Sequence, residues 1–111
     1  MAESTVATTT PDFCIADFCL VPLGTGNTSV STEVAMVQKV IRSCGLKYSL
    51  HSAGTTIEGP WEEVFAVIGR CHQTLHDNKY ARVHTDIRVG TRTDKAQSMT
   101  DKVPKVESLL K

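Results

Sequence analysis

The stretch His51-Ser-Ala-Gly-Thr-Thr-Ile-Glu-Gly-Pro60 decides the fold, because it joins the end of one strand to a second strand and to a helix. Ala53-Gly54 lies between two β-prone runs and is a turn signal, since glycine tolerates a positive φ. Gly59-Pro60 ends the second strand and places proline in the first turn of a helix. We therefore predict a hairpin over residues 46–58 that leads directly into a helix.

The segments on either side of this hairpin complete a regular order of elements. Phe13–Leu23 is apolar and β-prone, and a helix with apolar residues at spacings of three and four follows it up to Gly45. Core-spaced residues from Trp61 onward predict a second helix, and Arg82–Val89 alternates strictly between polar and apolar residues. A last helical stretch contains Pro104, which indicates a kink or a late start. The order predicts an α+β fold, a ferredoxin-like βαββαβ sandwich with an additional C-terminal helix.

The composition describes one ordinary domain without a strong overall charge. The 111 residues contain 12 Lys and Arg against 12 Asp and Glu, which leaves no overall field to attract nucleic acid or an anionic membrane. Residues 1–10 are rich in Ser and Thr and lack the basic start and apolar core of a targeting signal. The four cysteines lie among apolar neighbours without zinc-like spacing, so we expect buried thiols of a reducing compartment. We expect a disordered tail over residues 1–11, a single ferredoxin-like domain over residues 12–111, and a cytoplasmic location.

Two helices cover only one face of such a sheet, so the other face is solvated, covered by the last helix, or buried against another subunit. Alternation places the row containing Phe18, Leu50, Ile57 and Ile87 against the helices. The opposite face, called the open face below, then carries Asp17, Cys19, Ser49, His51, Thr56, Glu58, Arg82, His84, Asp86 and Arg88. Three interpretations stay open: a solvated face with cross-strand ion pairs, a subunit interface, or a ligand site at the rim of that interface. The rim would combine the loop of residues 22–27, the hairpin and residues 90–92.

Patterns for catalysis or metal binding are weak in this sequence. Asp17 and Glu58 could act as an acid and base pair, but carboxylates among arginines are more often structural. Cys19 lies on a strand, where a packed thiol is more common than a nucleophile. His72 and His76 share one helical face, more often a solvated face than a metal site, and no third ligand lies near them in the sequence. We therefore expect no catalytic residue, no metal site and no cofactor.

Two longer motifs carry a resemblance to a known family. They are Ser52-Ala-Gly-Thr-Thr-Ile-Glu-Gly-Pro60 and Arg82-Val-His-Thr-Asp-Ile-Arg-Val-Gly-Thr-Arg92, together with the early Val21-Pro-Leu-Gly24. Over these motifs the chain resembles the YkoF-like thiamine-binding protein family of small ferredoxin-like proteins, and it looks closest to the fungal members. The resemblance implies subunits paired through their sheets, commonly as a dimer of dimers, and a site for thiamine or a related molecule at or near subunit boundaries.

The chemistry of thiamine indicates what such a site would need. Thiamine has a cationic thiazolium, an aminopyrimidine and a hydroxyethyl arm, which call for a carboxylate, a hydroxyl or backbone acceptor, and an apolar wall. Given the resemblance, we expect a ligand site formed by Asp17, Leu23, Ser52, Thr55, Thr56, Glu58, Arg88 and Arg92. The two arginines suit this ligand only if they are paired with carboxylates or meet a phosphate, and Trp61 is more often core than wall. The expected function is a non-enzymatic, homo-oligomeric binding protein for thiamine or a thiamine-like molecule, and the alternative is a structural or interaction protein.

Overall fold

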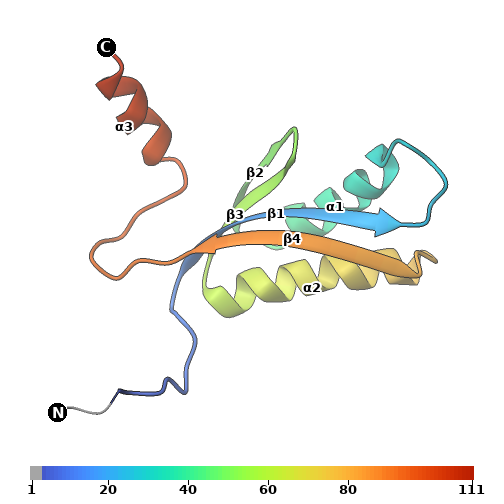
Figure 1. Ribbon diagram of the computed structural model, residues 1–111, viewed down its shortest axis with the longest axis horizontal. Coiled ribbons are helices and arrows are strands. Elements are labelled where there is room, and N and C mark those ends of the chain that lie inside the picture. Colours follow the sequence, from blue (N-terminus) through green and yellow to red (C-terminus); the bar gives the residue numbers. More distant parts are fainter. Residues whose placement is uncertain (1–3) are drawn as a thin grey trace.

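The computed structural model describes residues 4–111 and contains a four-stranded antiparallel sheet, two helices packed on one face of it, and a third helix that stands apart (Figure 1). The elements in chain order are β1 (Cys14–Leu23), α1 (Ser31–Ser43), β2 (Lys47–His51), β3 (Gly54–Gly59), α2 (Trp61–Asp77), β4 (Arg82–Gly90) and α3 (Lys102–Leu109). The strand order in the sheet is β2-β3-β1-β4. This is the ferredoxin-like βαββαβ arrangement with a C-terminal helix, so the predicted fold is confirmed.

The hairpin between β2 and β3 has the geometry that its glycines allow. Gly54 has a φ of +156°, and a Cβ at this position would lie 2.5 Å from the backbone oxygen of Phe18. The turn therefore needs a residue without a side chain, both for its backbone conformation and for its close approach to β1. Pro60 directly precedes α2, as the sequence predicted.

The hydrophobic core lies between the sheet and helices α1 and α2. Every second residue of β1 from Cys14 to Leu20 is buried, and the central residue of β3, Ile57, is fully buried. The helices contribute Val37, Ile41, Val64, Val67, Ile68, Cys71 and Leu75. The strict alternation along β1 separates this core from the open face, where the intervening residues are only partly buried.

Two residues expected to face the helices do so without being buried. The strand registers place Leu50 and Ile87 on the helix face, yet Leu50 is 52% exposed and Ile87 is 36% exposed. Both lie on the edge strands β2 and β4, beyond the width that two helices cover. Alternation therefore predicted the face of each residue correctly but not its degree of burial.

Helix α3 does not belong to this core. It begins at Lys102, so Pro104 lies in its first turn, where the missing N–H costs no helical hydrogen bond. None of its residues is buried, and Figure 1 shows it standing away from the sheet at the end of a long connection. Pro104 thus marks a late start rather than a kink.

Other sequence expectations can also be placed. Residues 4–11 are exposed and outside any helix or strand, whereas residues 1–3 lie outside the described part of the chain, so the disordered tail stays a prediction. The four cysteines are free thiols, and two of them, Cys14 and Cys71, are buried while Cys19 and Cys44 are partly buried. Within residues 4–111, no helix has the length and hydropathy required to cross a bilayer.

Candidate ligand site

The centre of the open face holds a polar cluster around Asp17. Its carboxylate lies 2.6 Å from His51 Nε2 and 3.3 Å from an Arg88 guanidinium nitrogen, and it accepts a longer hydrogen bond of 3.5 Å from the Thr56 hydroxyl. The amide of Ala53 donates to His51 Nδ1, so Nε2 is the ring nitrogen that carries the proton donated to Asp17. Each carboxylate oxygen of Asp17 therefore already has a partner.

These partners also determine the pKa of Asp17. Partial burial raises the pKa, but the hydrogen bonds from His51 and Arg88 and their positive charges outweigh it, so that the pKa lies below its ordinary value. Asp17 is thus an ionised group neutralised by its neighbours on β2 and β4. This arrangement is that of a structural ion pair rather than of a general acid or base.

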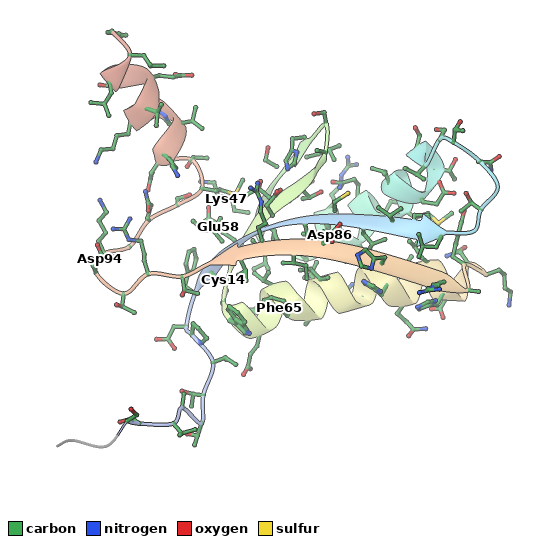
Figure 2. The ribbon with its side chains drawn as sticks, in the orientation of Figure 1. Cys14, Lys47, Glu58, Phe65, Asp86 and Asp94 are labelled. Carbon is green, nitrogen blue, oxygen red and sulfur yellow. The ribbon has the colours of Figure 1, made fainter. Side chains whose placement is uncertain are left out.

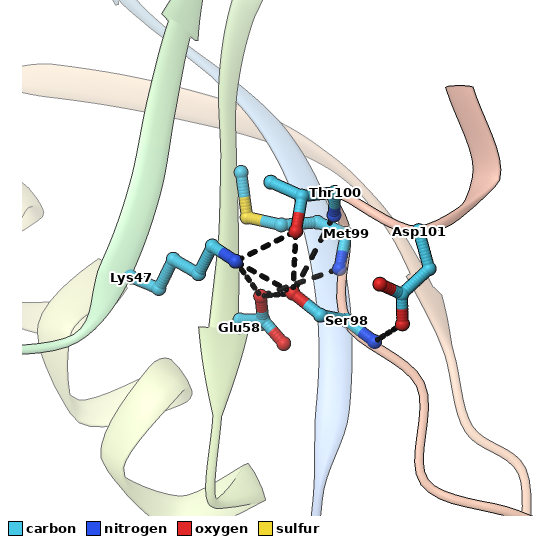
Figure 3. A network of polar contacts seen from close by, with 6 residues as sticks. All are labelled: Lys47, Glu58, Ser98, Met99, Thr100 and Asp101. Carbon is cyan, nitrogen blue, oxygen red and sulfur yellow. Dashed lines mark hydrogen bonds and ion pairs between the residues drawn. The ribbon is translucent and has the colours of Figure 1, made fainter. Parts of the chain in front are cut away.

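A second polar network surrounds Glu58, near the end of β3 (Figure 3). The Glu58 side chain is only 8% exposed. Its Oε1 atom accepts a hydrogen bond of 2.6 Å from the Ser98 hydroxyl and one of 3.2 Å from the Met99 amide. The Lys47 ammonium lies 3.8 Å from the same oxygen and donates to the hydroxyls of Ser98 and Thr100, each at 2.8 Å. The network ties the segment before α3 to the sheet.

All these contacts of Glu58 are made by one of its two oxygens. Oε2 accepts no hydrogen bond from any other residue in the described chain. The side chain as a whole is largely buried, but Oε2 keeps access to solvent, because no side-chain polar atom of the described chain is both buried and without a partner. Glu58 therefore retains an acceptor that neither the sheet nor the segment before α3 uses.

Glu58 lines a cavity of about 890 Å³ between the open face and residues 91–102. Phe13, Ile15 and Met99 give the cavity apolar walls, and Thr56 contributes a hydroxyl. Figure 2 shows Glu58 and Lys47 beneath the connection to α3, whereas Asp86 lies further along β4. The volume falls within the range of typical small-molecule sites, and a few polar groups on largely apolar walls are the usual lining of such sites.

Arg92 also lines this cavity, but its guanidinium is already engaged. It forms two hydrogen bonds with the carboxylate of Asp94 and a third with the side-chain oxygen of Gln97. The hydrogen bond from Arg92 lowers the pKa of Asp94 to about 2, and the pKa of Arg92 is correspondingly raised. Both arginines of the predicted site, Arg88 and Arg92, are therefore paired with carboxylates, which is the condition under which they suit a cationic ligand.

The structure brings together only part of the predicted site. Thr56, Glu58 and Arg92 line the cavity, and Asp17 and Arg88 lie next to it on the open face. The other three predicted residues do not join them.

Thr55 faces the helices, because it is opposite Phe18 in the β1–β3 register. It is 3% exposed, and its hydroxyl accepts a hydrogen bond of 2.8 Å from the Gln38 side chain on α1. Ser52 lies at the tip of the hairpin and, with Thr55, lines a separate groove of about 170 Å³ beside α1. Neither residue reaches the cavity that contains Glu58.

Leu23 lies at the far end of β1, opposite Arg82 in the register. Because β1 and β4 are antiparallel, Gly90 is opposite Ile15 at the start of β1. The loop of residues 22–27 and residues 90–92 are thus at opposite ends of the sheet, and the prediction that they form one rim is wrong within a single protomer.

Sequence reasoning missed Lys47, Ser98 and Met99, which complete the environment of Glu58. Ser98 and Asp101 are turn-forming residues just before α3, and the Asp101 carboxylate accepts a hydrogen bond from the Ser98 amide at 2.8 Å. A tight turn before α3 could therefore have been predicted. No local pattern, however, indicates that the Ser98 hydroxyl meets a carboxylate 40 residues earlier in the chain.

The two histidines of α2 have structural partners. His72 Nε2 forms a hydrogen bond with the Thr85 hydroxyl on β4, and His76 Nδ1 donates to the backbone oxygen of Tyr80 at 2.8 Å. The ring centroids are 6.4 Å apart. Within residues 4–111, no three His, Cys, Asp or Glu side chains are grouped so that they could hold a metal ion. His72 is thus bonded to the sheet rather than solvated.

Trp61 lies at the start of α2 and packs against Phe65, with the ring centroids 4.7 Å apart. It is partly buried against the core cluster. This position confirms that Trp61 belongs to the core and not to a ligand wall.

Comparison with known proteins agrees with this architecture. Residues 16–107 match the family described as thiamine-binding protein. The UPF0045 protein ECM15 of Eremothecium gossypii is 52% identical over 96 residues, which cover 86% of this chain and 91% of the relative. Among solved structures, the hypothetical protein MJ1052 of Methanocaldococcus jannaschii has a TM-score of 0.78 at 26% identity, covering 87% of this chain and 98% of that chain.

A Thermotoga maritima protein, TM0486, whose name associates it with thiamine biosynthesis or salvage, has a TM-score of 0.72 at 19% identity. The match covers 85% of this chain and 98% of that chain, and it supports the fold alone. The family match extends over most of the chain and includes the strands and helices that position Glu58. On this evidence the chain belongs to the thiamine-binding protein family.

Proposed function

We propose that the protein is a non-enzymatic, homo-oligomeric binding protein for thiamine or a thiamine-like molecule, and that the ligand occupies the cavity beside Glu58. The observation that carries this proposal is the Oε2 atom of Glu58, an acceptor without a partner in the described chain that belongs to a largely buried side chain on the wall of an 890 Å³ cavity in a member of the thiamine-binding family. The association of the Thermotoga maritima neighbour with thiamine metabolism agrees with the proposal. The four free thiols are compatible with a reducing cytoplasm, where we place the protein.

The geometry of Glu58 selects the part of the ligand that it would meet. Since Oε1 already accepts two hydrogen bonds, the carboxylate offers one further acceptor rather than a bidentate clamp. An exocyclic amino group of a pyrimidine can direct one of its two N–H donors to this acceptor, and it would place the flat ring against Phe13 and Ile15. The hydroxyl of Thr56 donates its proton to Asp17 in a long hydrogen bond, so its oxygen can accept one from the ring edge or the hydroxyethyl arm.

Calorimetry on the purified protein tests this proposal, with thiamine, its isolated pyrimidine and its phosphate esters as ligands. We expect Glu58→Gln to weaken binding by roughly 10- to 150-fold, because hydrogen bonds to a charged group contribute about 1.5–3 kcal/mol. Glu63→Gln, an exposed acid in the first turn of α2, is the matched control and should bind as the wild type does. The absence of heat with every ligand would remove the ligand proposal and leave the fold unaffected.

The rival function is that of a structural or interaction protein whose open face is only a subunit interface. The cluster of Asp17, His51 and Arg88 favours this alternative, because its members pair with one another and need no ligand to balance their charges. Sedimentation of Glu58→Gln separates the two functions. Loss of binding with the oligomer intact supports the ligand site, whereas dissociation of the oligomer supports the interface.

An enzymatic function on thiamine phosphates is the remaining class. Lys95 and Lys102 also line the cavity, so a phosphorylated ligand is included among the calorimetry ligands. Incubation of these esters with the protein should release no phosphate if the protein only binds them. Turnover that depends on Glu58 would replace the binding function with a hydrolytic one.

A further inference from the structure

Strand β1 extends past the hairpin that pairs with it. The register between β1 and β3 ends at Phe18 and Thr55, whereas β1 continues to Leu23 and stays paired with β4 over this length. In the described chain, the residues of β1 beyond Phe18 therefore have a neighbouring strand on one side only. Their other side faces the groove of about 170 Å³ that lies between α1 and the hairpin.

The backbone groups of Leu20 point toward this groove. A Cβ at Gly54 would lie 2.5 Å from the backbone oxygen of Phe18, so this oxygen is directed toward β3. In an antiparallel strand the N–H and C=O of one residue point to the same neighbouring strand, and successive residues alternate between the two neighbours. Leu20 comes two residues after Phe18, so its N–H and C=O point to the same side, beyond the end of β3.

Neither backbone group of Leu20 has a partner in the part of the chain that the structure describes. The hairpin residue next in line is Ala53, but its amide donates to His51 Nδ1. No loop hydrogen bond of residues 4–111 reaches Leu20 instead. Leu20 is only 8% exposed, and backbone groups of buried residues are almost always paired. An unpaired donor and acceptor side by side therefore indicate a place for a ligand.

The walls of the groove suit a small and uncharged ring. Apolar side chains of α1 and the hairpin line it: Val30, Val34, Val37 and Leu50. The side chains of Gln38 and Thr55 also line it, and they are bonded to each other. None of its described lining residues is Asp, Glu, Lys or Arg, so nothing there would balance a charged ligand. The volume equals that of roughly six water molecules, which is room for one ring and not for two linked rings.

We propose that this groove binds an uncharged planar heterocycle with a hydrogen-bond donor and an acceptor next to each other on its edge, as in an aminopyrazine or a cyclic amide. The ring acceptor would receive the Leu20 N–H, and the ring donor would reach the Leu20 C=O. The ring would then lie where β3 no longer continues the sheet, with one face on the valines of α1. The groove shares no lining residue with the cavity beside Glu58, so this site does not depend on the proposed function.

Amide NMR of the full-length protein, titrated with aminopyrazine and separately with uracil, tests the site. We expect the Leu20 amide resonance to move to lower field with a Kd on the order of 1 mM, as is usual for a fragment of this size. Binding of either ring supports the site, and the tighter one identifies the edge that Leu20 prefers. Absence of a Leu20 shift with both rings would overturn the proposal.

Two further ligands make this titration specific. Dimethylaminopyrazine cannot donate to the Leu20 C=O, so it should bind about tenfold more weakly than aminopyrazine. Equal binding of the two pyrazines would refute the paired hydrogen bonds. Thiamine should not displace either ring, and displacement would overturn the assignment of a separate, single-ring site.

Variants of the groove walls provide an independent test. Val34→Phe should fill the groove and abolish the Leu20 shift. Leu50→Ala removes one wall at a residue that is 52% exposed, so the domain should stay folded while binding weakens roughly fivefold. Leu23→Ala is the matched control, because Leu23 is 43% exposed and does not line the groove. Unchanged affinity in Leu50→Ala, or an equal loss in Leu23→Ala, would contradict the proposal.

Hydrogen exchange of the free protein tests the backbone argument by itself. The amides of Cys19 and Val21 alternate toward β4, where the register continues. The unpaired Leu20 amide should therefore exchange at least about tenfold faster than either of them. Equal protection of the three amides would show that Leu20 already has a partner, and the proposed site would be refuted.

Discussion

Replacement of Ser98 by alanine should loosen the segment over the cavity without unfolding the domain. The Ser98 hydroxyl donates to Glu58 Oε1 at 2.6 Å and accepts from the Lys47 ammonium at 2.8 Å. The variant would leave that oxygen with the Met99 amide at 3.2 Å and the ammonium at 3.8 Å. Because hydrogen bonds to charged groups contribute about 1.5–3 kcal/mol, the free energy of opening residues 91–101 should fall by that amount, or roughly 10- to 150-fold in the opening equilibrium.

Amide hydrogen exchange measures this change directly at Met99. The Met99 amide is bonded to Glu58 itself, so its protection factor should fall by the same ratio. The free energy of global unfolding in urea should fall by less, since α3 buries none of its residues and the segment lies outside the core cluster. Ser43→Ala is the matched control, because its hydroxyl donates to the Val40 carbonyl on the exposed side of α1. Unchanged exchange at Met99, or a global loss equal to the local one, would refute the role given to this network.

Three further measurements test other parts of the structure. Gly54→Ala should lower the free energy of unfolding in urea by about 3 kcal/mol and Gly59→Ala by about half as much. Both glycines have nearly the same positive φ, but the first new methyl group would lie 2.5 Å from a backbone oxygen of β1 and the second 2.9 Å from a movable leucine side chain; equal losses would contradict this reasoning. Although burial raises the pKa of Asp17, hydrogen bonds from His51 and the neighbouring arginine lower it overall, so its contribution to stability is complete above about pH 4 and is lost as the pH falls through the lowered pKa. In Asp17→Asn the free energy of unfolding should accordingly fall less between about pH 6 and pH 2 than it does in the wild type. Parallel curves of unfolding free energy against pH for the two proteins would show that the ion pairs of Asp17 contribute nothing to stability. Burial raises the pKa of Cys71 to about 11, so a thiol reagent should label it only as fast as the protein unfolds, and labelling of the native protein as rapid as that of the partly exposed cysteine on β1 would contradict this burial.

The fold could be predicted because its signals are local. Alternation along β1 and β4, glycine and proline at the ends of β3, and apolar spacing along the two packed helices each depend on residues close together in the sequence. The same alternation assigned Thr56 and Glu58 to the open face and Ile57 to the core. It also placed Thr55 on the helix face. The alternation therefore argued against including the Thr55 hydroxyl in the expected ligand site.

The site was harder to predict, because it depends on which strand ends meet. Antiparallel pairing brings the start of β1 beside the end of β4 and separates both from the loop that follows β1. Residues 91–101 have no periodicity, so nothing in the sequence indicated that they cover the end of β3. Long-range contacts of an irregular segment are fixed by side-chain chemistry such as that of Ser98, which local patterns do not describe.

The contrast between the two carboxylates of the open face decides where a ligand would bind. Asp17 and Glu58 lie on neighbouring strands of the same face, and from sequence they were equivalent candidates. In the structure both oxygens of Asp17 have cationic or proton-donating partners, whereas Glu58 is more deeply buried and has one oxygen without any partner in the described chain. A ligand that binds Asp17 must break existing ion pairs, but a ligand that binds Glu58 adds a missing donor. Removal of the Asp17 charge should therefore affect assembly and acid stability, and removal of the Glu58 charge should affect ligand affinity, so the pair of variants Asp17→Asn and Glu58→Gln separates the two functions of one sheet face.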